Sequence, residues 1–305
     1  MKWKESFHPY AMITIFFWSL AYVLTRIALG YFSPFTLGFL RYLIASCAML
    51  LVLCLAKIGL PEKKDVKWFV IAGATGFFFY MIFFNLGSVT VNSSTSSMIV
   101  ATVPIITALF ARYVHGEQLK LFQWIAILIA FAGVNIITLM NGIFKVDKGI
   151  LWLLLAAVSL SLYNLIQRKL TKTYPALQTT AFSIFTGTFM LALFSSESVT
   201  IVQNAPLTMI ICVLILGIFS STIAYAAWSQ AFVKAENTSS VSNYMFVTPF
   251  LASLMGFLIA GEKPDFPTIM GGFVILSGLL LFYYGDRIHK YAFYKIKVNL
   301  KSNRK

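Results

Sequence analysis

The chain has 305 residues, of which 59% are hydrophobic and only 11% are charged. A soluble domain carries about 25% charged residues, so this composition excludes an ordinary globular protein and indicates that lipid surrounds much of the chain. The formal net charge of +14 does not indicate a nucleic-acid-binding protein, because the basic residues stand in short clusters between long apolar runs, as they do in membrane proteins.

Apolar segments of about the length that a helix needs to cross a bilayer, roughly 20 residues, follow one another along the whole chain. They cover residues 9–30, 34–56, 67–86, 94–114, 122–140, 150–170, 176–195, 207–232, 239–260 and 267–285. Short connections that contain Pro, Gly or Asn separate them. The sequence therefore predicts an all-α integral membrane protein with ten transmembrane helices.

The distribution of basic residues predicts the orientation of these helices. The N-terminus, the tail and every second connection together hold 19 of the 24 Lys and Arg residues, whereas the remaining connections hold three. Cytoplasmic connections of membrane proteins are rich in Lys and Arg. We therefore expect both termini in the cytoplasm and a multi-pass protein of the cell membrane, the bacterial plasma membrane in particular.

The chain contains an internal repeat. Shifted by 145 positions, residues 92–133 match residues 237–278 without a gap. The matched positions include Asn92 and Asn237, Pro104 and Pro249, and Gly116-Glu117 and Gly261-Glu262. This repeat predicts a first half over 1–145, a second half over 146–288 and a basic cytoplasmic tail over 289–305. Because each half has an odd number of spans, the second must enter the membrane from the opposite side, as in inverted-repeat transporters.

Several of these residues resemble a known family. Trp18-Ser19, the stretch Pro34 to Leu37 with Arg41, and the two Gly-Glu pairs look like the EamA-type domains of the drug/metabolite transporter superfamily. The resemblance covers residues 9–285, although Arg26 stands where relatives often carry Lys. It implies ten helices, both termini inside, and the export of amino acids or other metabolites.

Pro104 and Pro249 lie at matching positions in the middle of two spans. Proline leaves the carbonyl four residues earlier without its helical partner, and such carbonyls are tolerated at mid-depth where they line a polar cavity. We interpret the prolines as paired hinges that flex during transport, with a packing kink as the alternative. Ser97 and Asn243, near the polar starts of these spans, are cavity candidates, with capping and small-residue packing as the alternative.

Charged residues within or at the ends of spans need partners. Arg41 stands about 10 Å below the start of its span. A charge at that depth is costly and needs a partner. We therefore expect Arg41 to line an outward-facing cavity or gate, with hydrogen bonds to backbone carbonyls as the alternative. Arg26 lies nearer a span end, from which its side chain can reach the interface. For Glu117 and Glu262, a bond to backbone or to a basic loop residue is favoured over a role in coupling.

Aromatic and polar residues within the spans complete the candidate substrate cavity. Trp18 and Tyr22 share one helix face, because they are four residues apart. The other candidates are Tyr80, Asn85, Tyr163, Asn164, Tyr225, Trp228 and Tyr244. Rings with a few polar groups suit a mid-sized, partly apolar substrate, whereas packing or an interfacial aromatic belt is the alternative for any single ring.

No Asp, Glu or His lies in the middle of a span. This absence disfavours proton coupling through a buried acid. It also disfavours a membrane enzyme, which would need acids, histidines or metal ligands for its chemistry.

The hypothesis is a secondary transporter, an exporter of amino acids or related small metabolites that works by alternating access around a central cavity. An exporter of toxic or drug-like compounds, or a phosphorylated-sugar exchanger, is the alternative. We expect a small-molecule substrate and the lipid bilayer as partners, no nucleic acid, no cofactor or metal, and a monomer, with a homodimer as the alternative.

Overall fold

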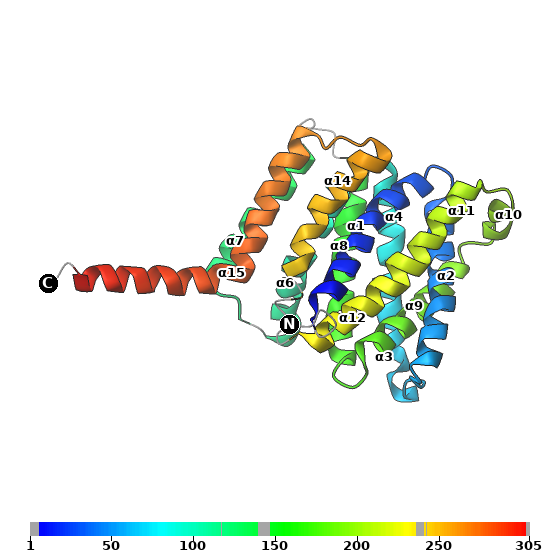
Figure 1. Ribbon diagram of the computed structural model, residues 1–305, viewed down its shortest axis with the longest axis horizontal. Coiled ribbons are helices and arrows are strands. Elements are labelled where there is room, and N and C mark those ends of the chain that lie inside the picture. The colour runs from blue at the N-terminus through cyan, green and yellow to red at the C-terminus, as the bar shows by residue number, and fades with distance from the viewer. Residues whose placement is uncertain (1–5, 117, 140–146, 236–240, 242, 303–305) are drawn as a thin grey trace.

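The computed structural model describes residues 6–116, 118–139, 147–235, 241 and 243–302, with the side chains of His115, Val199, Asn243 and 286–302 left out of the description. Every regular element within these ranges is helical (Figure 1). The first half contributes α1 (His8–Ala28), α2 (Pro34–Leu55), η2 (Lys63–Asp65), α3 (Val66–Gly73), η3 (Ala74–Phe79), α4 (Tyr80–Thr90), α5 (Ser93–Val100), α6 (Val103–His115) and α7 (Leu121–Leu139). The second contributes α8 (Lys148–Leu170), α9 (Ala176–Ala192), α10 (Ser198–Gln203), α11 (Leu207–Leu214), η4 (Ile215–Ile223), α12 (Ala224–Lys234), η5 (Asn243–Val247), α14 (Thr248–Ala260) and α15 (Phe266–Ser302).

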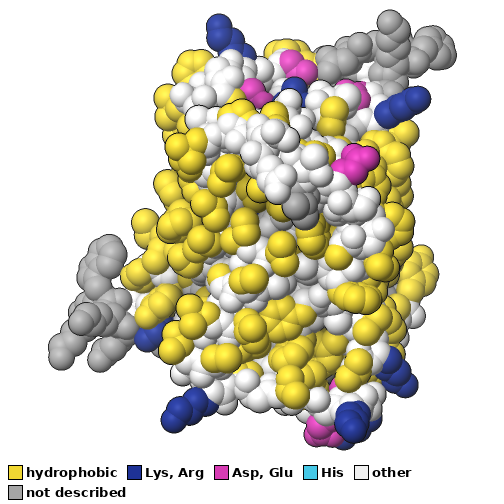
Figure 2. All heavy atoms as spheres, turned by 90° about the vertical axis from the view of Figure 1, so that its right-hand side faces the viewer, with side chains coloured by type: hydrophobic (Ala, Val, Ile, Leu, Met, Phe, Trp, Pro, Cys, Tyr) yellow, Lys and Arg dark blue, Asp and Glu magenta, His cyan; other side chains and the backbone are white. Residues whose placement is uncertain are grey.

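The protein is a multi-pass membrane protein. Within the described ranges, eight helices are long and apolar enough to cross a membrane. On the face shown in Figure 2, hydrophobic side chains cover the middle of the molecule and Lys and Arg lie toward its two ends. Large apolar side chains such as Leu50, Leu128 and Phe189 point outward and are more than half exposed, as expected of residues that face lipid.

The predicted spans differ from the observed helices at several places. The span predicted over 94–114 is two helices, α5 and α6, and those predicted over 176–195 and 239–260 appear as the shorter helices α9 and Tyr244–Ala260. The sequence reading missed α10, which lies in a connection. The boundary predicted at residue 288 is not a break in the helix, because α15 continues to Ser302 and projects from the bundle (Figure 1).

Contacts between helices are equivalent when the two halves are exchanged. Helix α1 packs against α12 and α14, and its counterpart α8 packs against α4 and α6. Helix α2 packs against its counterpart α9, and α7 packs against its counterpart α15. These are the contacts that a two-fold relation between the halves requires.

Small residues let paired helices approach closely, as is common in membranes. A Cβ atom on Gly133 of α7 would lie 2.7 Å from the carbonyl oxygen of Gly271 of α15. On the other side of the molecule, a Cβ on Gly73 would lie 2.7 Å from the carbonyl oxygen of Ser183 of α9. Both pairs join one half to the other, so the glycines hold the halves at backbone contact.

Candidate functional site

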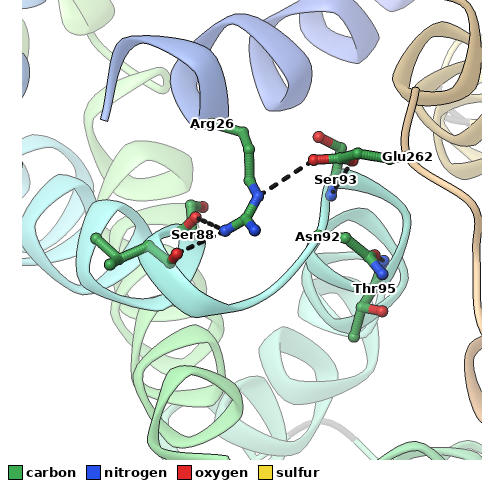
Figure 3. A network of polar contacts seen from close by, with 7 residues as sticks. Arg26, Ser88, Asn92, Ser93, Thr95 and Glu262 are labelled. Carbon is green, nitrogen blue, oxygen red and sulfur yellow. Dashed lines mark hydrogen bonds and ion pairs between the residues drawn. The ribbon is translucent and has the colours of Figure 1, made fainter. Parts of the chain in front are cut away.

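A polar network joins the halves at the end of the bundle where α1 ends (Figure 3). Arg26 Nε donates to Glu262 Oε1 at 3.1 Å, and Arg26 Nη1 donates to the carbonyls of Ser88 and Val89 at 2.8 and 2.6 Å. The other carboxylate oxygen of Glu262 accepts from the backbone N–H of Ser93 at 2.8 Å. One ion pair therefore connects α1, α4, α5 and the end of α14.

The sequence supplies the local geometry that positions this network. Gly261 ends α14 in the left-handed conformation, at φ +65°, and so directs the following Glu262 back toward the bundle. The side chain of Asn92 caps α5 by accepting from the N–H of Thr95 at 2.8 Å. This cap does not use the N–H of Ser93, which donates to the Glu262 carboxylate. An anion at a helix N-terminus is favourable.

The Arg26 side chain, which is near enough to a span end to reach the membrane interface, is 31% exposed and forms the ion pair with Glu262. The expectation that Glu262 binds backbone or a basic residue is confirmed, although its basic partner lies on α1 and not in a loop. Glu117, the counterpart of Glu262, lies outside the described residues.

Arg41 lies deeper in the bundle and has a different environment. Its side chain is only 7% exposed. Its Nε donates to the hydroxyl of Ser221 at 2.8 Å, and its Cζ lies 5.7 Å from the centre of the Tyr42 ring. Over the described residues, no carboxylate pairs with it and no backbone carbonyl accepts from it. A charge at such a depth costs about 2.5–3.5 kcal/mol on insertion scales, and one neutral hydroxyl does not neutralise it.

Aromatic residues from both halves pack against one another near Arg41 and form what we call the aromatic cluster. Trp18 lies 5.2 Å, between ring centres, from both Tyr225 and Trp228. Phe77 joins Tyr225 to two further rings, at 5.2–6.1 Å, and Phe84 joins two tyrosines at 5.4 and 5.7 Å. The members of the cluster are Trp18, Tyr22, Tyr42, Phe77, Tyr80, Phe84, Tyr163, Tyr225 and Trp228.

Three tyrosines of the aromatic cluster keep some accessible surface. These are Tyr22, Tyr80 and Tyr225, which lie within electrostatic range of Arg41. Tyr42 and Tyr163 are almost fully buried. Phenol and indole rings near one guanidinium make these surroundings mostly apolar with a single positive group.

Two sequence candidates have contacts that serve packing between neighbouring helices. Asn85 is fully buried and its Nδ2 donates to the carbonyl of Pro34 at 2.8 Å, which fixes α4 to the start of α2. Asn164 Nδ2 donates to Thr107 Oγ1 at 3.3 Å and so joins α8 to α6.

Three further candidates lie near the interrupted ninth span or its counterpart. Ser97 is buried and donates to the carbonyl of Ser94 in its own helix. The Tyr244 hydroxyl lies 2.6 Å from His8 Nδ1, at the end of the bundle where α1 begins. The side chain of Asn243 lies outside the described residues.

The two prolines stand at matched helix interruptions. Pro104 is the second residue of α6, directly after the break between α5 and α6 at Ala101 and Thr102. Pro249 is the second residue of α14, directly after η5. Both spans are thus irregular just before the proline, as the lost hydrogen bond predicts.

Sequence reasoning missed Tyr42, Phe77, Phe84 and Ser221 as members of the site. A signal for Ser221 exists, because Ser220, Ser221 and Thr222 form a polar run inside an apolar span. A second missed feature is a matched pair of π-helical segments, η3 and η4, in the third and eighth predicted spans. Such segments occur often at functional sites. Here η3 carries Phe77 and η4 carries Ser221, so both supply residues around Arg41.

Two other observations bear on the chemistry of the site. The described residues contain no group of three or more His, Cys, Asp or Glu side chains placed to hold a metal ion. A separate pocket of about 400 Å³ opens between α5, α14 and α15, and its lining is almost wholly apolar, with Met98, Phe250 and Leu276 among its residues. It lies apart from Arg41, so the aromatic cluster is the better candidate for the recognition of a polar solute.

Comparison with known proteins agrees with this picture. The model of the EamA-like transporter family matches residues 7–139 and again residues 147–284. The uncharacterized transporter YdfC of Bacillus subtilis is 32% identical over 269 residues, which cover 87% of each chain. The probable terminal-alkyne amino-acid exporter of Streptantibioticus cattleyicolor is 24% identical over 88% of this chain and 91% of its own. A solved crystal structure shares the fold with a TM-score of 0.62 and 20% identity, over 90% of this chain and 95% of that chain. This family and these relatives indicate that the chain is a transporter and not an enzyme. The chain belongs to the EamA-like transporter family.

Proposed function

We propose that the chain is a secondary transporter of the bacterial plasma membrane that exports amino acids or related small metabolites. The observation that carries the proposal is the aromatic cluster, which brings residues of both halves together near Arg41. Inverted-repeat transporters hold their substrate at this place, between the repeats near the bilayer midplane. The relative named as an amino-acid exporter supports the substrate class.

The mechanism is alternating access, in which one half rocks against the other around the cluster. The ion pair between Arg26 and Glu262 holds α1 to α14 and so closes the bundle at one end. Opening that end requires the pair to separate, and substrate binding must supply the free energy. We assign the closed end to the outside of the cell and both termini to the cytoplasm, following the distribution of Lys and Arg.

The direct test of the proposed function is transport by the purified chain in liposomes. Vesicles loaded with an unlabelled amino acid should accumulate the same labelled amino acid by counterflow, and a panel of amino acids, peptides, organic cations and sugar phosphates identifies the class. Arg112→Gln, a change in an arginine that lies over Trp124 and away from the cluster, serves as a matched control that keeps full activity. Counterflow of sugar phosphates or organic cations without amino acids would replace the proposed substrate class.

Sugar-phosphate exchange has less support from the structure. A doubly charged phosphate needs several cationic groups around it, and Arg41 is the only Lys or Arg that is buried among the described residues. A single guanidinium fits a single carboxylate.

A further inference from the structure

We propose that Arg41 is the anchor for the carboxylate of an amphipathic substrate, and that the substrate needs no amino group to bind. This inference rests on the proposed function and specifies which chemical group the transporter recognises. Its starting point is the unbalanced charge of Arg41, a buried guanidinium that the described residues leave without an anionic partner. A protein tolerates such a charge where a ligand supplies the opposite one.

The geometry leaves the recognition end of Arg41 available. Its Nε is occupied by Ser221, whose side chain comes from η4 of the second half. The two Nη groups make no hydrogen bond with the described residues and are not among the fully buried unpaired atoms. A guanidinium with its Nε held presents its Nη groups as a planar fork that matches a carboxylate.

The residues near Arg41 determine which group the substrate can carry next to its carboxylate. The Tyr42 ring lies 5.7 Å from the guanidinium carbon, and Tyr22, Tyr80 and Tyr225 are near enough for an electrostatic interaction with it. An apolar or aromatic group fits against these rings. No Asp or Glu belongs to the cluster, so nothing there compensates an ammonium group by an ion pair. The site therefore recognises its substrate by the carboxylate and does not require an α-amino group.

The position of Ser221 also couples binding to the two halves. Arg41 belongs to the first half and Ser221 to the second, so a carboxylate that binds the fork sits on the contact between them. Ser221→Ala should leave the carboxylate bound but less well oriented, with a weaker affinity and with selectivity for the acid preserved.

The test uses the full chain in lipid nanodiscs and two probes of almost equal shape, phenylacetate and its neutral amide, phenylacetamide. Millimolar phenylacetate should raise the melting temperature of the wild type and of the Arg112→Gln control, and the amide should not. Arg41→Gln should weaken the apparent affinity for phenylacetate by about tenfold or more, since a hydrogen-bonded charge pair is lost. Phenylpyruvate, which has a keto group in place of the α-amino group, should bind at least as tightly as L-phenylalanine.

Loss of folding does not confound this test, because an unpartnered buried charge is itself destabilising. Without any ligand, Arg41→Gln should melt at the same temperature as the wild type or higher, and Arg41→Lys provides a second variant that keeps the charge but loses the fork. The proposal is overturned by equal shifts with acid and amide, by no shift with either in the wild type, or by an undiminished shift in Arg41→Gln. Selective binding of the acid together with failed amino-acid counterflow would instead overturn the proposed function and leave the carboxylate site standing.

Discussion

At the scale of single residues, the contact between Arg26 and Glu262 has the clearest consequence for stability. Arg26 donates to one carboxylate and two carbonyls, and Glu262 accepts from Arg26 and from the start of α5. Glu262→Gln removes the charge from both contacts, and Arg26→Gln leaves the carboxylate with its backbone partner alone. We expect each change to lower the melting temperature by a few degrees, and the double variant to lose less than the sum.

The coupling energy of this pair should be about 1 kcal/mol, since the Arg26 side chain is 31% exposed and partly screened. A double-mutant cycle by thermal unfolding in detergent measures it. The exposed pair of Lys64 and Glu62, at 72% and 59% exposure, is the matched control, and its cycle should give a value near zero. Additive effects of Arg26→Gln and Glu262→Gln would show that the observed ion pair contributes nothing to stability.

These residues also show how far sequence reasoning reaches at this scale. Mid-span position and residue type were enough to select Arg41, Trp18, Tyr80 and Tyr225 as candidates for the proposed site. Their partners were not predictable, because Arg26 and Glu262 are 236 positions apart, and Arg41 and Ser221 are 180 apart. Which residues form a pair depends on how each helix is rotated about its axis. In a helix that is apolar on nearly all sides, the sequence indicates this rotation only weakly.

At the scale of elements, the close crossing of α3 and α9 predicts a specific sensitivity. A Cβ on Gly73 would clash with Thr186 Oγ1 and would lie 2.7 Å from the carbonyl oxygen of Ser183. Because the second contact is with backbone, the helices must move apart to accept it. Gly73→Ala should therefore cost about 1–3 kcal/mol from overpacking, which exceeds the gain of about 1 kcal/mol in helix propensity.

Thermal unfolding of Gly73→Ala checks this, with Gly59→Ala as the control. A Cβ on Gly59 meets no atom within 4 Å, so that variant should unfold like the wild type. A Gly73→Ala protein as stable as the control would mean that α3 and α9 do not touch through their backbones in the membrane.

The elements divide into those with a sequence signal and those without one. The ends of α6 and α14 at Gly116 and Gly261, both left-handed, follow from the glycine itself, and Pro104 and Pro249 mark the breaks before them. The π-helical segments η3 and η4 follow no residue pattern, since an extra residue in a helical turn depends on tertiary contacts that replace the lost hydrogen bond. Sequence therefore placed the spans but not the irregular turns that hold Phe77 and Ser221.

At the scale of the whole molecule, the equivalence of contacts under exchange of the halves explains where the site lies. A site on a two-fold relation receives residues from both halves, as Arg41 and Ser221 illustrate. In the proposed inverted repeat, exchanging the halves would also exchange the two ends of the bundle, so a state closed at the end of Arg26 and Glu262 would have a counterpart closed at the other end. Such an exchange requires the halves to lie in opposite orientations in the membrane.

Opposite orientations predict the side on which each connection lies, and two exposed residues test it. Lys172 follows the sixth predicted span and should face the cytoplasm, whereas Glu197 follows the seventh and should face the outside.

In a chain whose three cysteines, Cys47, Cys54 and Cys212, are replaced by alanine, we expect Glu197→Cys to react with a membrane-impermeant maleimide in intact cells. Lys172→Cys should react only after the cells are permeabilised, because the bilayer shields it. The reverse pattern would invert the orientation, and reaction of both in intact cells would contradict a single orientation.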